Sequence, residues 1–165
     1  MKETIIINFA KFPFCFRTAT TRDFTNKLKD EKQFADKFKD LLEKLLPHVY
    51  QKTFEEYMSN DYHCHIIGKK DNDKIERINR VVSELVKNWN PGINADDFIK
   101  QNLEGEVLWQ LGIGSIRLIG IRRKNILDVL FIDYHHLIYP SVKYNDKEYS
   151  RNNFGIIECT EEEYE

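Results

Sequence analysis

The stretch from Trp109 to Tyr139 constrains the fold of this chain more than any other. It contains three segments that are rich in β-branched and aromatic residues and alternate between apolar and polar positions. Gly112, Gly114 and the charged segment 122–125 separate these segments as turn signals. Because the connections are so short, we expect the three strands to pair as an antiparallel meander. The expected strands cover about residues 106–113, 115–122 and 126–133.

The preceding part of the chain reads mostly as helix. Apolar residues recur at helical spacing, most clearly from Ile75 to Trp89, and Asn94 is a candidate N-cap. We predict that Pro47 ends the first helix. The expected helices are 23–46, 50–58, 75–89 and 94–103, and short strands are expected at 4–9 and 62–67. These elements predict an α+β fold in which N-terminal helices pack on a C-terminal antiparallel β-sheet.

The length of 165 residues predicts a single domain. Within it, residues 1–95 are expected to be mostly helical with short strands, and residues 96–158 to form the sheet. Residues 159–165 form an acidic tail.

The net charge of −2 argues against the global basic field of a dedicated nucleic-acid binder. Locally the balance shifts, because the segment 109–151 holds seven basic and four acidic residues, a charge of +3. The three cysteines are odd in number and form no C-x-x-C pair, which favours a reducing compartment. There is no apolar run long enough for a membrane span or a secretory signal. We therefore expect a cytoplasmic protein without a membrane partner.

The end of the third expected strand carries the candidate chemistry. Side chains alternate along a strand, so Asp133 and His135 should share one face, where the carboxylate could orient the imidazole as a general base. His136 should project to the other face, and Tyr139 borders the same edge if the chain turns at Pro140. The alternative is that both histidines are partly buried and satisfied by neighbouring backbone groups.

Basic side chains on the same strands are candidates for binding an anionic substrate. Arg117 lies mid-strand, where it either pairs with a buried carboxylate or faces an anion. Arg122 and Arg123, in an expected hairpin tip, and Lys143 are candidates for phosphate contacts. A basic turn of this kind is also compatible with an ordinary solvated loop.

His63 and His65 form an H-x-H pattern on an expected strand, a spacing that can chelate zinc or another transition metal. They remain weak candidates, because nothing in the sequence brings a third ligand to them. The chain has no phosphate-binding loop, dinucleotide fingerprint, nucleophile elbow or H-E-x-x-H motif. We expect no cofactor.

The region of about residues 96–150 resembles the RelE/ParE-type toxins of bacterial toxin–antitoxin modules. The resemblance lies in the order of helices, the strand 106–111, the motif Gly114-x-x-Arg117, the strand 125–132 and a histidine-containing segment that ends at Tyr139. It implies a RelE-like meander and metal-independent RNA cleavage. Carried over by position, Arg117 would bind phosphate, and the family's arginine, histidine and tyrosine would correspond to His135, Tyr134 and Tyr139.

Two functional hypotheses follow. The first is a toxin-like ribonuclease, similar to an mRNA interferase, with RNA as substrate and a cognate antitoxin as partner. Its catalytic residues would be Arg117, His135, His136 and Tyr139. The second is a non-enzymatic accessory factor of phage or mobile-element origin that binds a protein partner through exposed aromatic residues and charged helix faces.

Overall fold

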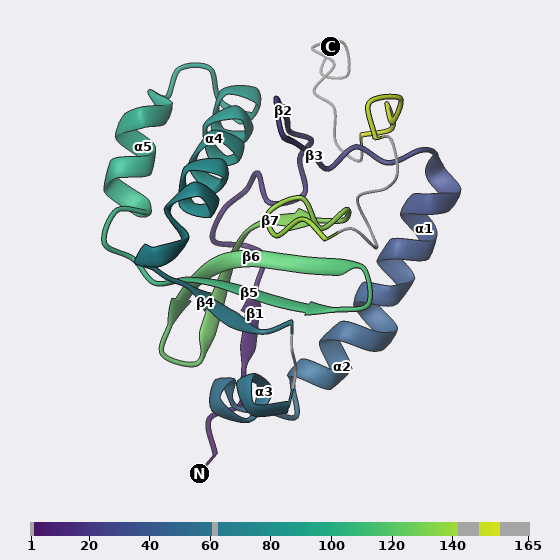
Figure 1. The fold of residues 1–165 in the computed structure, drawn as a ribbon, viewed down its shortest axis with the longest axis vertical. Helices are drawn as coiled ribbons and strands as arrows, with labels where there is room; N and C mark the ends of the chain where they lie inside the picture. The colour runs from purple at the N-terminus through teal and green to yellow at the C-terminus, as the bar shows by residue number, and fades with distance from the viewer. Residues whose placement is uncertain (1, 61–62, 142–148, 156–165) are drawn as a thin grey trace.

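The computed structural model describes residues 2–60, 63–141 and 149–155. Its centre is a five-stranded mixed sheet with the order β1-β7-β6-β5-β4 (Figure 1). The last three strands form the predicted meander, in which β5 pairs antiparallel with β6, and β6 with β7. The strands of the sheet are β1 (Ile6–Asn8), β4 (His65–Ile67), β5 (Leu108–Ile113), β6 (Ile116–Arg123) and β7 (Ile126–Asp133).

Helices cover both faces of this sheet. Figure 1 shows α4 and α5 on one side and the run from α1 to α3 on the other. A separate small ribbon of β2 (Thr20–Thr21) and β3 (Phe24–Thr25) contacts α4. The helical elements are α1 (Glu31–Asp40), the π-helical η1 (Leu41–Leu45), α2 (Leu46–Val49), α3 (Phe54–Asn60), the 3-10 turn η2 (Lys69–Asp71), α4 (Asn72–Trp89) and α5 (Ala95–Asn102).

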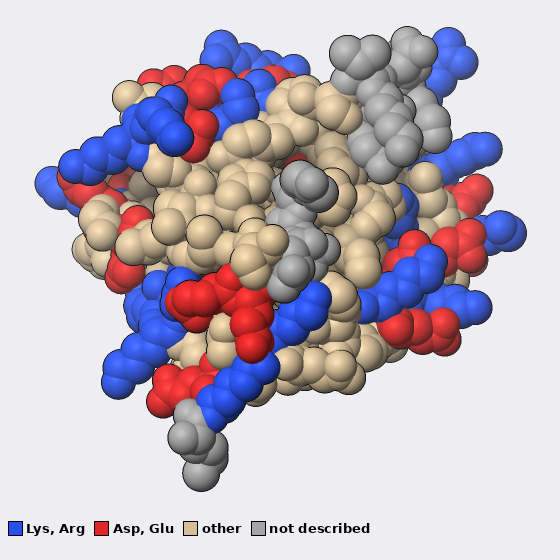
Figure 2. All heavy atoms as spheres, turned by 60° about the horizontal axis from the view of Figure 1, so that its bottom comes forward, with Lys and Arg blue, Asp and Glu red and all other residues tan. Residues whose placement is uncertain are grey.

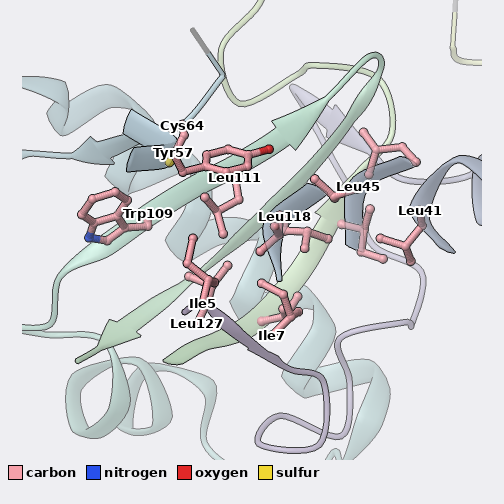
Figure 3. Close-up of a cluster of buried hydrophobic side chains, with 14 of the residues drawn as sticks. Ile5, Ile7, Leu41, Leu45, Tyr57, Cys64, Trp109, Leu111, Leu118 and Leu127 are labelled. Carbon is pink, nitrogen blue, oxygen red and sulfur yellow. The ribbon is translucent and has the colours of Figure 1, made fainter. Parts of the chain in front are cut away.

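Side chains along the meander alternate between two hydrophobic cores, one on each face of the sheet. Leu111 and Leu118 face η1 and α3, and Figure 3 shows them with Leu41, Leu45 and Trp109 in this first core. Ile119 and Phe131 face the opposite way and pack against the apolar stripe of α4. Apolar side chains on both faces bury most of β5, β6 and β7, as expected for strands sandwiched between helices.

The α+β fold class is confirmed, but the sheet is not purely antiparallel. β1, at the start of the chain, pairs parallel with β7, and Ile6 lies opposite Ile126. β4, from the region expected to be mostly helical, pairs with β5. The sheet therefore draws strands from both parts of the chain that the sequence suggested were distinct.

The first helix also differs from the prediction. It begins at Glu31, where the Asp30 side chain accepts a hydrogen bond from Gln33, and residues 24–25 form β3. Pro47 does not end the helical run, which continues to Val49. In the wider π turn before it, the Leu46 amide donates to the Leu41 carbonyl, and Pro47 enters the first turn of α2, where its missing N–H costs little.

Candidate functional site

A small cavity of about 160 Å³ lies where β7 ends. Three elements meet there: helix α1, the turn that joins β5 to β6, and the segment that follows β7. Figure 1 shows α1 alongside this end of the meander. The lining residues are Gln33, Lys37, Ser115, Tyr134, His135, His136 and Tyr149. The cavity thus combines an ammonium group, a hydroxyl group and two imidazoles from segments far apart in the sequence.

Lys37 and Ser115 form one wall of the cavity. The Lys37 ammonium group donates a hydrogen bond to the Ser115 hydroxyl, which joins α1 to the β5–β6 turn. Gly114 precedes the serine with φ of +55°, a left-handed backbone that glycine adopts without strain. The glycine in this turn therefore brings the serine side chain to the helix.

His136 lies within the cavity in an unusual backbone conformation. Its φ is +57°, in the left-handed region that non-glycine residues seldom occupy. The residue is 6% exposed, and this burial lowers its pKa to about 4, with further lowering by the Arg117 charge. A hydrogen bond to the Gly114 backbone opposes part of this shift. His136 is therefore a neutral imidazole at pH 7.

His135 is held by groups on both sides of its ring. Its Nε2 lies 2.7 Å from the Lys27 carbonyl, an acceptor, so that nitrogen carries the proton. Its ring stacks on Tyr149 with a centroid distance of 4.2 Å. Burial lowers the pKa of His135 despite the nearby Asp133 charge. The ring is thus fixed in one tautomer at the edge of the cavity.

The expected pairing of the Asp133 carboxylate with the His135 imidazole does not form. β7 ends at Asp133, and its carboxylate accepts hydrogen bonds from the backbone amides of His135 and Ile138, at 3.1 and 2.9 Å. The strand alternation on which the prediction relied stops at this residue, because the carboxylate closes a turn instead. Asp133 therefore shapes the segment that carries both histidines.

Arg117 lies directly behind the cavity and does not line it. It is 2% exposed, and its Nη1 donates to the carbonyls of Gly114 and Ile116, both at 2.8 Å. Its Nη2 is 3.0 Å from Nδ1 of His63. From the sequence we expected Arg117 to pair with a buried carboxylate or to face an anion. The partners described here are instead two carbonyls and an imidazole.

Tyr139 lies apart from the cavity. Its ring packs edge-on against His65, with centroids 4.7 Å apart, and the Lys74 ammonium group lies 5.7 Å from the ring centroid. Burial and the Asp71 carboxylate raise the pKa of the Tyr139 phenol. The structure therefore brings His135 and His136 together but places Tyr139 with β4 and the start of α4.

Arg122 and Arg123 lie at the opposite end of β6 from Arg117 and are engaged by carboxylates. Arg122 pairs with Glu55 and stacks over the rings of Phe54 and Trp109. Arg123 pairs with Glu106 and Asp128, at 2.8 and 2.7 Å. Figure 2 likewise shows basic and acidic side chains interspersed on the face turned to the viewer. The third predicted substrate-binding residue, Lys143, lies outside the described residues.

The weak metal candidates do not form a recognisable centre. One ring nitrogen of His63 faces the Arg117 guanidinium, and the His65 ring is half-buried against Tyr139. Within residues 2–60, 63–141 and 149–155, no group of three or more His, Cys, Asp or Glu side chains is arranged to hold a metal ion.

Sequence reasoning missed Lys37 and Ser115. Lys37 is one of several lysines on a charged helix, and nothing in its spacing distinguishes it. Ser115 stands beside Gly112 and Gly114, which served only as turn signals. The pairing of residues 78 positions apart is visible only in three dimensions.

Comparison with known proteins identifies the family. The family model described as "Uncharacterised protein UU032" matches residues 11–162. A protein of Ureaplasma parvum serovar 3 with the same description is 36% identical over 131 residues, which make up 79% of this chain and 67% of that relative. No solved structure matches. In the described part of the chain, no helix has the length and apolar character needed to cross a bilayer. The match over most of its length shows that the chain belongs to the UU032 family.

Proposed function

We propose that this protein is a metal-independent endoribonuclease of the toxin type, with its active site in the cavity between α1 and the end of β7. The observation that carries this proposal is the convergence of Lys37, Ser115, His135 and His136 on one small cavity. Cleavage of RNA without a metal needs a base, a proton donor and positive charge at the phosphate. These side chains supply all three.

His136 is the general base in this scheme. As a neutral imidazole it accepts the proton of the ribose 2′-hydroxyl, and the 2′-oxygen attacks the adjacent phosphorus. The bond from phosphorus to the 5′-oxygen then breaks, and the Lys37 ammonium group donates the proton that the leaving oxygen needs. The products are a 2′,3′-cyclic phosphate and a 5′-hydroxyl end.

Lys37 also supplies the positive charge that the transition state requires. The hydrogen bond to the Ser115 hydroxyl holds its ammonium group in place, so the side chain does not rotate freely. A charge held in place before the reaction needs no reorganisation as negative charge develops on the phosphate oxygens. Ser115 and Gln33, on the same wall, are further donors to those oxygens.

The biological setting of the proposal rests on the resemblance of residues 96–150 to RelE/ParE-type toxins. That setting is the bacterial cytoplasm, with RNA as the substrate and a cognate antitoxin as the protein partner. The proposed site differs from the pattern carried over by resemblance, because it uses Lys37 and Ser115 and leaves out Tyr139.

The test is cleavage of a single-stranded RNA by the purified protein in the presence of a chelator. Replacing His136 by Asn should lower the rate by about 10²–10⁴-fold, as for loss of a general base. Replacing Lys37 by Gln should lower it by about 10²–10³-fold, as for loss of one group that stabilises the transition state. Induction in a bacterial host should arrest growth with the wild type and not with either variant.

Lys39→Gln is the matched control, because Lys39 lies on the same helix two residues away and its side chain is exposed. It should cleave RNA at the wild-type rate. Equal activity of the Lys37 and Lys39 variants, or no cleavage by any of the proteins, would refute the proposed site.

A second candidate function is binding of another protein, and a groove favours it. The groove, of about 910 Å³, lies beside β4, the last strand of the sheet, and α5 forms its other wall. Ile66 and Val107 on its rim are 46% and 47% exposed. An extended apolar segment of a partner could pair with the edge of β4 and place side chains in this groove.

A photo-crosslinking residue at position 66 tests this second function in cells. It should capture one defined protein, and Val107→Glu should abolish the capture. Ile6, 47% exposed on β1 at the opposite edge, is the matched control position. The same products from positions 6 and 66 would argue against a specific binding groove.

A further inference from the structure

Arg117 is a buried cation that donates hydrogen bonds to two backbone carbonyls and to His63. At 2% exposure its guanidinium has little contact with water, so its charge must be satisfied inside the fold. The carbonyls of Gly114 and Ile116 and the Nδ1 of His63 provide acceptors at 2.8, 2.8 and 3.0 Å. A guanidinium can only donate, so His63 accepts at Nδ1 and is neutral there.

The neighbouring strand is shaped to admit this side chain. Gly112 lies opposite Arg117 in the pairing of β5 with β6. A Cβ at position 112 would come within 2.4 Å of the arginine Cδ and 2.7 Å of its Nη1. The arginine arm therefore crosses the strand over a glycine and reaches the far side of the turn, which no larger residue at position 112 would permit.

The turn that Arg117 holds is the one that carries a wall of the cavity. Gly114 accepts from Arg117, and the next residue is Ser115, the hydrogen-bond partner of Lys37. The backbone of Gly114 is also hydrogen-bonded to His136. One peptide segment thus links the guanidinium to the serine, the lysine and the histidine of the proposed site.

We infer that Arg117 is a positioning residue: with His63, its buried guanidinium fixes the Gly114–Ser115 turn and sets where Ser115 and His136 lie in the cavity. It does not contact the substrate phosphate. This inference rests on the proposed function only for its activity readout, since the order of the turn can be measured without any substrate.

The charged and titratable groups around His136 agree with this role. The Arg117 and Lys37 charges both disfavour the protonated imidazole, and burial has the largest effect. Removing the guanidinium should therefore let the His136 pKa rise from about 4 toward the ordinary value of 6.5. A residue that bound only substrate through a flexible arm would not produce this change in the free protein.

NMR on two arginine variants tests the inference. In Arg117→Met, we expect the backbone order parameters of Gly114 and Ser115 to fall from about 0.85 to below about 0.6. The His136 pKa should rise in the same variant, because the Arg117 charge lowers it in the wild type. Arg117→Lys keeps the charge without the fork, so the turn should lose order while the His136 pKa stays low.

A pair of histidine variants tests the same link without removing the buried charge. His63→Gln retains an acceptor for Nη2, and His63→Leu does not. The leucine variant alone should loosen the turn. This pair decides the question if Arg117→Met does not fold, as judged by its near-ultraviolet circular dichroism.

Kinetics separate this inference from the proposed function. A positioning role predicts that Arg117→Lys lowers kcat with little change in KM, whereas a phosphate contact would raise KM. Unchanged order parameters and His136 pKa in Arg117→Met, or equal turn order in the two His63 variants, would overturn the inference. If the protein cleaves no RNA, the proposed function fails while the NMR results still decide the role of Arg117.

Discussion

His136 should make the protein lose stability as the pH falls from 6.5 to 4. Burial, reinforced by the Arg117 charge, lowers the His136 pKa from 6.5 to about 4. Between these values the unfolded chain binds a proton at this position that the folded chain does not, so acid favours unfolding. Above pH 6.5 the imidazole is neutral in both states. At about 1.4 kcal/mol per pKa unit, the full loss is about 3 kcal/mol.

The assay is urea unfolding of the wild type and His136→Asn at several pH values across this range. Asparagine does not titrate and tolerates the left-handed backbone at this position, where φ is +57°. His65 and His135 also have lowered pKa values and weaken the protein in acid in both forms. The difference between the two proteins therefore isolates His136.

We expect the wild type to lose about 3 kcal/mol more than His136→Asn between the two ends of the range. Parallel stability curves for the two proteins would refute the reasoning. They would mean that the His136 imidazole reaches water readily enough to keep its ordinary pKa.

Three further predictions concern the framework of the site. Gly112→Ala should lower the free energy of unfolding by about 3 kcal/mol, because its Cβ would overlap the Arg117 side chain. Gly114→Ala has open space and should lower it by only about 1 kcal/mol, because of its positive φ. Equal midpoints of the two variants in thermal unfolding would contradict this order. Tyr57→Phe removes a buried hydrogen bond of 2.9 Å from the phenol to the Gly112 carbonyl and should cost about 1 kcal/mol in urea unfolding, and a neutral effect would show that the carbonyl finds another donor. Asn94→Ala removes the side-chain N-cap of α5 and should lower the free energy of unfolding by about 1 kcal/mol in urea, and an unchanged value would show that another group satisfies the Asp97 amide.

The meander and the longest helix were predictable because their signals are local. Alternation in residues 106–133 located β5, β6 and β7 to within two residues, since both cores depend on that alternation. The stripe from Ile75 to Trp89 identified α4, and Asn94 caps α5 as expected. In each case the residues that define the pattern also make the contacts.

The remainder depended on contacts between distant segments. β1 has only three residues, and it pairs parallel with β7 across 120 positions, which no local pattern specifies. Asp133 and His135 were predicted to pair because the alternation of the strand was expected to continue to His135. Instead, the Asp133 carboxylate accepts hydrogen bonds from backbone amides. Lys37 reaches the site only because helix α1 packs beside the β5–β6 turn. The sequence therefore predicted His135 and His136 of the candidate site but not Lys37 and Ser115.

The most direct test of the central claim compares one RNA oligonucleotide with the same oligonucleotide carrying a single 2′-deoxy sugar at the cleavage position. The proposed mechanism uses the 2′-oxygen as the nucleophile and His136 as its base. We predict that the wild type cleaves the all-ribose strand to a 2′,3′-cyclic phosphate end in the presence of chelator and leaves the 2′-deoxy position intact. Cleavage of both strands, or of neither, would contradict the account.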